Sequence, residues 1–208
     1  APMDIRSALE AAGGDEVTVL VNSPGGDMTV GAEIRSMLRR YQGKTTALFQ
    51  GYGASAATLA VSACTVIQSE PGALLCYHNP SGAAEGDYHE MRRSAEALRN
   101  ARDCILEMYT ARRASKSREE LIPLMNKDIW TTPTEAREYG LTDEIGTLEG
   151  VTEPEGDPAA FVAAAGRIRL TAAMREQYRR HVAADREAAA RDCEAKRILA
   201  RLGTLAKY

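Results

Sequence analysis

The sequence has no long apolar run and no basic leader followed by an apolar stretch. A membrane-spanning helix needs about eighteen or more consecutive apolar residues, and no segment of the 208 residues approaches that length. We therefore expect no membrane segment and no secretory leader. A hydrophobic content of 44% and a charged content of 26% are typical of a soluble globular protein with one core and an appendage.

Cysteine is scarce, and none of the four cysteines forms a Cys-x-x-Cys pair. Three of them, Cys64, Cys76 and Cys104, lie in apolar helix or strand contexts. We therefore predict buried thiols in a reducing compartment, the cytoplasm, and no disulfide or zinc framework. Neither a metal nor another cofactor is expected, nor is a nucleic-acid partner.

The net charge of −3 divides unevenly along the chain. Residues 1–158 carry 15 basic and 24 acidic side chains, a net of −9, and residues 159–208 carry 11 basic and 5 acidic, a net of +6, so that the two sum to −3. Glu-Pro-Glu-Gly-Asp-Pro at 153–158 is the best linker candidate. The sequence thus predicts a main domain over 1–150 and a basic helical tail over 151–208 with its own partner surface.

Segments that predict strands alternate at short intervals with segments that predict helices. The predicted strands are residues 17–21, 45–50, 65–68, 73–77 and 141–145, and helices are predicted at 4–11, 27–41 and 55–64. Later helices begin with capping-box patterns at Ser117 and at Thr132. The alternation predicts an α/β fold with a largely parallel sheet.

A long amphipathic helix is predicted over residues 87–111, where Asp87 and Glu90 form a capping-box pattern. Its apolar positions follow a spacing of three or four residues, interrupted by Arg102, at Tyr88, Met91, Ala95, Leu98, Ile105 and Tyr109. Such a stripe packs either into the core or against another subunit, and the pattern favours neither.

Ser55 lies in a run of small residues, Gly-Tyr-Gly-Ala-Ser-Ala-Ala at 51–57, which ends a predicted strand and begins a predicted helix. Small neighbours leave room for a substrate backbone, and a helix N-terminus favours a developing oxyanion. Tight helix packing is the alternative, and it explains the alanines better than the serine. A serine becomes a nucleophile only when a neighbouring base takes its proton.

His78 and Asp128 can complete a Ser-His-Asp set in chain order. His78 follows the predicted strand 73–77 and opens a loop, whereas His89 and His181 are expected in solvent. Asp128 lies between two helical segments, just before an apolar pair. Each has a structural alternative, because a strand end can hold a histidine and a helix start an acidic cap.

Gly25 and Gly26 follow the predicted strand 17–21. A glycine pair commonly forms a tight turn and nothing more. Its functional use would be to point a backbone N–H into the site of Ser55, with the Ala56 N–H as a second donor.

Four segments together resemble the Clp protease proteolytic subunit family, and most closely its phage relatives, the ClpP-like prohead proteases. They are Asn-Ser-Pro-Gly-Gly at 22–26, the run at 51–57, Cys-Tyr-His-Asn-Pro at 76–80 and the segment 128–143. The likeness covers residues 1 to about 148. It implies a crotonase-like spiral of ββα units, in which the long helix is a handle that joins stacked rings.

The resemblance also implies roles for the candidate residues. Ser55 matches the nucleophile, His78 the general base and Asp128 the orienting acid. Gly26, with Gly25 beside it, and Ala56 match the oxyanion donors. It implies a homo-oligomeric serine endopeptidase that cleaves protein or peptide substrates.

Departures from the family pattern favour the phage relatives. The family's initial strand and axial loops are missing at the start of this chain, so we expect no ATP-driven unfoldase partner. Ala56 follows the nucleophile where the cellular protease usually has methionine. The expected setting is the prohead of an infected cell, where the basic segment 159–208 would contact capsid or scaffold proteins.

Three alternatives remain open. The chain could be a housekeeping Clp subunit that works with an unfoldase. It could be a crotonase-type lyase or hydratase, which shares the oxyanion hole but acts on acyl-CoA with carboxylates. Finally, it could be an inactive assembly or scaffold subunit, in which His78 would lie far from Ser55.

Overall fold

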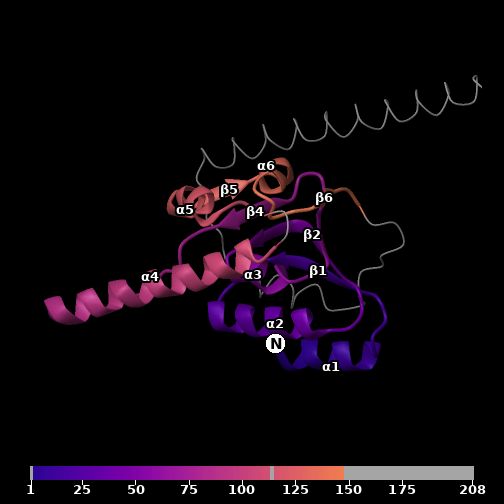
Figure 1. The fold of residues 1–208 in the computed structure, drawn as a ribbon, viewed down its shortest axis with the longest axis horizontal. Helices are drawn as coiled ribbons and strands as arrows, with labels where there is room; N and C mark the ends of the chain where they lie inside the picture. The colour runs from indigo at the N-terminus through magenta and orange to yellow at the C-terminus, as the bar shows by residue number, and fades with distance from the viewer. Residues whose placement is uncertain (1, 113–114, 148–208) are drawn as a thin grey trace, which may run out of the picture. The chain divides into compact units, whose positions relative to one another are not determined.

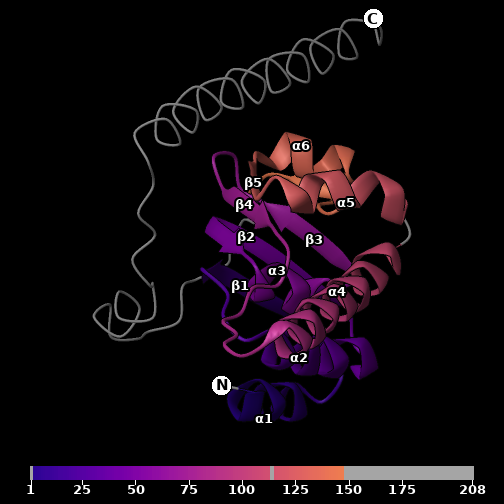
Figure 2. The ribbon, with the colours of Figure 1, turned by 90° about the vertical axis from the view of Figure 1, so that its left-hand side faces the viewer.

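The computed structural model describes residues 2–112 and 115–147 of the chain. The predicted linker and the basic tail at 151–208 lie outside the described residues. The described part is an α/β fold, as predicted, with a six-stranded sheet and helices around it. Figure 1 and Figure 2 show α1 (Pro2–Ala12) and α2 (Met28–Arg40) below the strands, and α5 (Arg118–Asn126) and α6 (Pro133–Glu138) above them.

The sheet is built around one long central strand, β2. The strands are β1 (Val17–Ser23), β2 (Thr45–Ala54), β3 (Val66–Ser69), β4 (Leu74–Tyr77), β5 (Ile129–Thr131) and β6 (Glu144–Ile145). They follow the order β5-β4-β2-β3-β6, with β1 also paired to β2, and only the β4–β5 pair is antiparallel. The prediction of a largely parallel sheet is therefore confirmed.

The two ends of β2 have different neighbours. Its first half pairs with β3, where Thr46 lies opposite Val66, whereas its last three residues pair with β4, where Ala54 lies opposite Cys76. Because β2 extends beyond the end of β3, its last residue, Ala54, lies beside the carboxyl end of β4. Ser55 and His78, the residues that follow these two strands, are thereby brought to the same edge.

Helix starts follow the local capping signals. Asp27 caps α2 through the Thr29 N–H, and full capping boxes begin α4 (Tyr88–Thr110), α5 and α6, at Asp87, Ser117 and Thr132. These starts are confirmed because a capping box needs only residues three positions apart. The helix expected to begin after Asp4 in fact begins at Pro2, and Asp4 lies in its first turn.

The long helix α4 has two different halves. Its C-terminal end buries Ile105, Leu106 and Tyr109 in the core, whereas near its start Tyr88 is 68% exposed and Met91 47% exposed. In Figure 1 the N-terminal half extends away from the sheet. The predicted apolar stripe is therefore a core stripe only over its last two turns.

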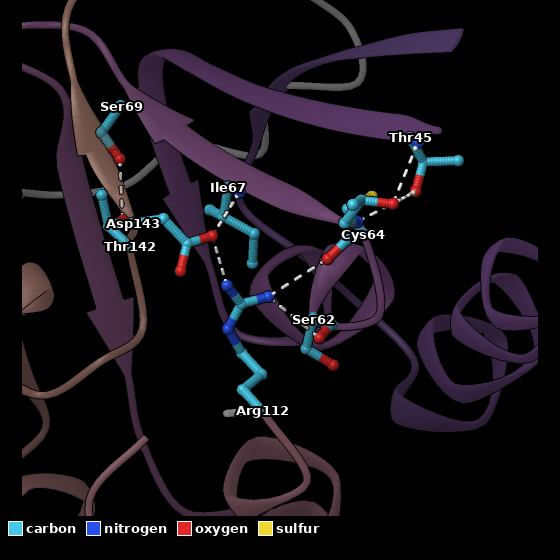
Figure 3. Close-up of polar contacts among 9 residues, drawn as sticks. Thr45, Ser62, Cys64, Ile67, Ser69, Arg112, Thr142 and Asp143 are labelled. Carbon is cyan, nitrogen blue, oxygen red and sulfur yellow. Dashed lines mark hydrogen bonds and ion pairs between the residues drawn. The ribbon is translucent and has the colours of Figure 1, made fainter. Parts of the chain in front are cut away.

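Arg112, just beyond α4, ties this helix to the rest of the fold. Its guanidinium pairs with the Asp143 carboxylate at 2.5 Å and donates to the carbonyls of Ser62 at 3.2 Å and Cys64 at 3.4 Å, as Figure 3 shows. Asp143 also accepts from the Ile67 N–H at 2.7 Å. Arg112 thus joins the end of α4 to the turn after α3 (Ala56–Val61) and to the edge of the sheet.

Two further predictions need correction. Cys64 and Cys76 are buried as predicted, but Cys104 is exposed on α4. The strand expected over 141–145 is confined to Glu144–Ile145, with Leu141 and Thr142 buried ahead of it. Within the described chain, no helix combines the length and the apolarity needed to cross a membrane.

Candidate active site

Ser55 occupies the sharp turn between β2 and α3. Its backbone has φ 57° and ψ −129°, a conformation that non-glycine residues rarely adopt and that costs about 1–3 kcal/mol. The Ser55 N–H donates to the Cys76 carbonyl at 2.9 Å, which continues the β2–β4 pairing by one step. Its side chain makes no capping hydrogen bond to α3, so the hydroxyl is not used to start the helix.

The Ser55 carbonyl is fixed by three donors. It accepts from the Thr58 hydroxyl at 2.7 Å, from the Thr58 N–H at 3.1 Å and from the Leu59 N–H at 3.4 Å. The Thr58 hydroxyl also lies 2.7 Å from the hydroxyl of Tyr109, which comes from the buried end of α4. Sequence reasoning missed Thr58 and Tyr109, because their contact spans 51 residues and no local pattern marks it.

The glycine pair lies against this turn. Gly25 has φ 88°, and a side chain there would collide with the Ala54 carbonyl and approach the Ala56 nitrogen to 2.7 Å, so only glycine fits. The Gly25 N–H already donates to the Ser23 hydroxyl at 3.1 Å. By contrast, the N–H groups of Gly26 and Ala56 donate to no acceptor within the described residues.

His78 follows β4 directly and is half-buried. Its Nδ1 lies 2.6 Å from the carbonyl oxygen of Asn79, and because a carbonyl only accepts, this contact requires the proton on Nδ1. The Nε2 atom of the neutral ring is then a free acceptor. Asn79 is itself held, because its side-chain amide donates to the Asn126 side chain at 3.0 Å.

One pocket joins these groups. It has a volume of about 360 Å³ and is lined by Ser55, His78, Gly26 and Ala56, together with apolar side chains that include Leu59, Leu98, Ile105 and Tyr109. A polar group set in a mainly apolar concave surface is typical of a ligand site. Four of the six residues named from the sequence therefore share one cavity.

Asp128 does not line this pocket, and it lies just before β5, beside the end of the β4–β5 ladder. β5, which the sequence did not predict, pairs with β4 so that Cys76 lies opposite Trp130 and Tyr77 opposite Ile129. His78 and Asp128 are the residues that adjoin the last pair of this ladder, Tyr77 and Ile129.

The Asp128 carboxylate makes no hydrogen bond to His78 in the described part of the chain, where Asn79 is the partner of Nδ1. Asp128 is exposed and has φ 48°, a left-handed conformation immediately before β5 begins. Burial, and after it the charge of Asp128, raises the pKa of Cys76 to about 12. No group of three His, Cys, Asp or Glu side chains that could hold a metal occurs within residues 2–112 and 115–147.

Comparison with known proteins identifies the family. The Clp protease family model matches residues 7–149, more than half of the chain, and the chain belongs to the Clp protease family. Its curated relatives include an ATP-dependent Clp protease proteolytic subunit from Nephroselmis olivacea, 30% identical over 127 residues, covering 60% of this chain and 61% of the relative. Proteolytic subunit 3 from Streptomyces avermitilis is 29% identical over 148 residues, covering 70% of this chain and 67% of the relative.

A solved structure has the same fold. A mutant of ClpP1 from Listeria monocytogenes superposes with a TM-score of 0.62 at 24% identity, covering 71% of this chain and 85% of that one. The ClpP-type fold expected from the sequence is therefore confirmed. The chain spans about 60% of the length of the first curated relatives that it matches.

Proposed function

We propose that this chain is a serine endopeptidase with Ser55 as the nucleophile, His78 as the general base and Asp128 as the orienting acid. The observation that carries the proposal is the single pocket shared by Ser55, His78, Gly26 and Ala56. Membership of the Clp protease family supports it. So does the strained backbone of Ser55, because such strain concentrates at functional sites.

The first chemical step follows from the tautomer of His78. With its proton on Nδ1, the ring takes the Ser55 hydroxyl proton at Nε2 while the Ser55 oxygen attacks the peptide carbonyl. The ring then returns that proton to the leaving amine, and water releases the acyl group by the same sequence in reverse. A hydroxyl that caps no helix is free for this attack.

The oxyanion of the tetrahedral intermediate needs backbone donors that are not already in use. We assign the N–H groups of Gly26 and Ala56 to this role, because neither donates to another acceptor in the described chain. Gly25 supports the site by its close approach to the Ser55 turn, since its own N–H is held by Ser23. Each such donor contributes about 10²–10³ in rate in related chemistry.

Asp128 would replace the Asn79 carbonyl at Nδ1 in the reactive arrangement. Both partners hold the same tautomer, but only a carboxylate stabilises the imidazolium that forms during the reaction. The β4–β5 ladder supports this role, because its last pair, Tyr77 and Ile129, adjoins His78 and Asp128 in the chain. We therefore expect Asp128→Asn to lower the acylation rate by about 10⁴-fold while leaving substrate binding intact.

The decisive experiment is labelling of the full-length chain with a fluorophosphonate, followed by mass mapping. We expect covalent modification at Ser55, its loss in Ser55→Ala and His78→Ala, and unchanged thermal unfolding in Ser55→Ala. Ser62, which is buried and bonded to the Leu59 carbonyl, gives the matched control Ser62→Ala, which should still label. An unlabelled wild-type oligomer would favour the inactive assembly subunit instead.

For the substrate we propose phage prohead processing without an ATPase. Ala56 after the nucleophile and the basic composition of residues 159–208 support this setting. The relatives' names, which read ATP-dependent Clp protease, favour the second candidate, a proteolytic subunit fed by an unfoldase. Cleavage of a folded capsid or scaffold protein without ATP would support the first, and cleavage that needs an unfoldase with ATP would support the second.

We further propose that the protein assembles into a ring-forming homo-oligomer through α4. The exposed apolar side chains of Tyr88 and Met91 support this, because they lie on the half of the helix that leaves its own core. An ordinary surface helix keeps such residues on its packed face.

A further inference from the structure

A buried chain of hydroxyl groups connects the long helix α4 to the backbone of Ser55. The Thr58 hydroxyl has one proton, and it donates that proton to the Ser55 carbonyl at 2.7 Å. The contact of 2.7 Å between Thr58 and Tyr109 must therefore be donated by the Tyr109 hydroxyl. The order is thus Tyr109 to Thr58 to the Ser55 carbonyl oxygen.

Both residues that form this chain of hydroxyl groups are almost fully buried. Thr58 is 3% exposed and Tyr109 4% exposed. Burial raises the pKa of Tyr109, so the phenol keeps its proton and remains a donor. In such surroundings a hydrogen bond is costly to break, because no water can replace the missing partner.

The orientation of the Ser55 carbonyl matters because the Ala56 N–H belongs to the same peptide bond. The Ser55–Ala56 peptide is planar and trans, so its carbonyl and the Ala56 N–H point in opposite directions. Holding the carbonyl toward Thr58 fixes the direction of the Ala56 N–H, which belongs to the candidate oxyanion hole. The same hydrogen bond helps to hold the Ser55 backbone at its positive φ, a conformation that is costly for a residue with a side chain.

From this geometry we infer that Tyr109 and Thr58 are positioning residues, which orient the Ser55–Ala56 peptide plane so that the Ala56 N–H meets the oxyanion. The inference rests on the proposed function, because the orientation has catalytic meaning only if Ser55 reacts. It differs from that proposal in naming residues that neither attack the substrate nor transfer its proton, although the Tyr109 side chain also lines the pocket.

The chain offers a matched control for the tyrosine. Tyr77 packs edge-on against Tyr109, with ring centroids 5.6 Å apart, and is equally buried. Its hydroxyl has no hydrogen-bond partner in the described residues. Tyr109→Phe and Tyr77→Phe therefore remove the same atom from two neighbouring, similarly buried rings, and only the first interrupts the hydroxyl chain.

The test is the fluorophosphonate reaction of the full-length protein, resolved into its maximal labelling rate and the probe concentration for half-saturation. We expect Tyr109→Phe to lower the maximal rate roughly fivefold without changing half-saturation, and Tyr77→Phe to react as the wild type does. Thr58→Ser retains a hydroxyl and should restore most of the rate that Thr58→Val loses.

The double variant Thr58→Val, Tyr109→Phe separates positioning from stability. Removing both partners leaves no unpaired buried group, so its thermal stability should return close to that of the wild type. Its labelling rate should stay low, because the Ser55 carbonyl still lacks the hydroxyl donor. A rate that recovers together with stability would overturn the inference.

The outcomes also distinguish this inference from the proposed function. Equal maximal rates in the wild type and Tyr109→Phe would overturn the positioning role and leave Ser55 as the nucleophile. A wild-type protein that never labels at Ser55 would overturn both.

Discussion

At the scale of single residues, the fold holds Ser55 in a backbone conformation that residues with a side chain rarely adopt. Glycine adopts its φ of 57° without a steric penalty, whereas any side chain there is strained. The hydroxyl makes no capping bond that could compensate within α3. The candidate nucleophile, Ser55, therefore reduces the stability of the fold that presents it.

This strain predicts an order of stability for two inactive variants. Ser55→Gly should unfold with a free energy about 1 kcal/mol higher than Ser55→Ala, because both lose the hydroxyl and only glycine relieves the backbone. Urea unfolding of the two full-length variants measures the difference. Equal stability, or a more stable alanine variant, would show that the turn is not strained.

The cysteines give a prediction about reactivity and pH. Burial raises the pKa of Cys64 to about 11, and burial with the nearby Asp128 charge raises that of Cys76 to about 12. At pH 8 both remain thiols, so iodoacetamide should modify exposed Cys104 and spare these two until the chain unfolds. Peptide mapping after a short reaction checks this, and rapid native labelling of Cys64 or Cys76 would contradict it.

The same pKa shifts set the direction of the alkaline pH dependence. In the unfolded chain a thiol ionises near its ordinary value of 9.0, while in the fold it keeps its proton to about 11 or 12. The stabilising contribution is therefore complete below pH 9 and is lost as the pH rises toward 11 or 12. Unfolding midpoints in urea should fall across that range.

At the scale of elements, local signals were sufficient for helix starts and insufficient for β5. The caps at Asp87, Ser117 and Thr132 could be read from the sequence because donor and acceptor are near neighbours in the chain. β5 has only three residues, and only its pairing with β4, more than fifty residues earlier, makes it a strand. The sequence could therefore indicate Asp128 as a candidate, but it could not predict the position of Asp128 relative to β4.

Arg112 allows the joint between α4 and the sheet to be tested. Its side chain is 8% exposed, and Arg112→Met would leave Asp143 without its cation and two carbonyls without a donor. We expect the free energy of unfolding to fall by about 2 kcal/mol, less than for a fully buried pair because Asp143 is 27% exposed.

A surface pair supplies the control for this measurement. Arg6 and Glu33 lie 3.7 Å apart and are each 50% exposed, so Arg6→Met should change stability by no more than about 0.5 kcal/mol. Guanidinium unfolding of both variants gives the comparison. Similar small losses in the two would mean that Arg112 does not hold the joint.

At the scale of the whole molecule, the alternation of strands and helices in the sequence predicted the α/β class, because that pattern follows directly from chain order. The packing of α4 could not be predicted, since its apolar repeat is the same whether a core or another subunit covers it. Cys104 was misjudged for a related reason: it adjoins buried Ile105 in the sequence, but it faces solvent on the helix.

The proposed assembly through α4 predicts the effect of a surface charge. Met91→Glu should shift the protein to smaller species in analytical ultracentrifugation, because it places a charge among exposed apolar side chains. Asn100→Glu, on an exposed position of the same helix, should leave the sedimentation profile unchanged. Identical profiles for Met91→Glu and the wild type would contradict assembly through this surface.

The proposed role of Asp128 depends on the register of the short β4–β5 ladder. Three residue pairs fix the register that ends beside His78 and Asp128, and a slip of one position would bring the ammonium of Lys127 to the place of the Asp128 carboxylate. The connection between α5 and β5 should therefore accept exchanges of residues far more readily than changes of length. One added or deleted residue there would leave a folded protein whose histidine faces the wrong charge.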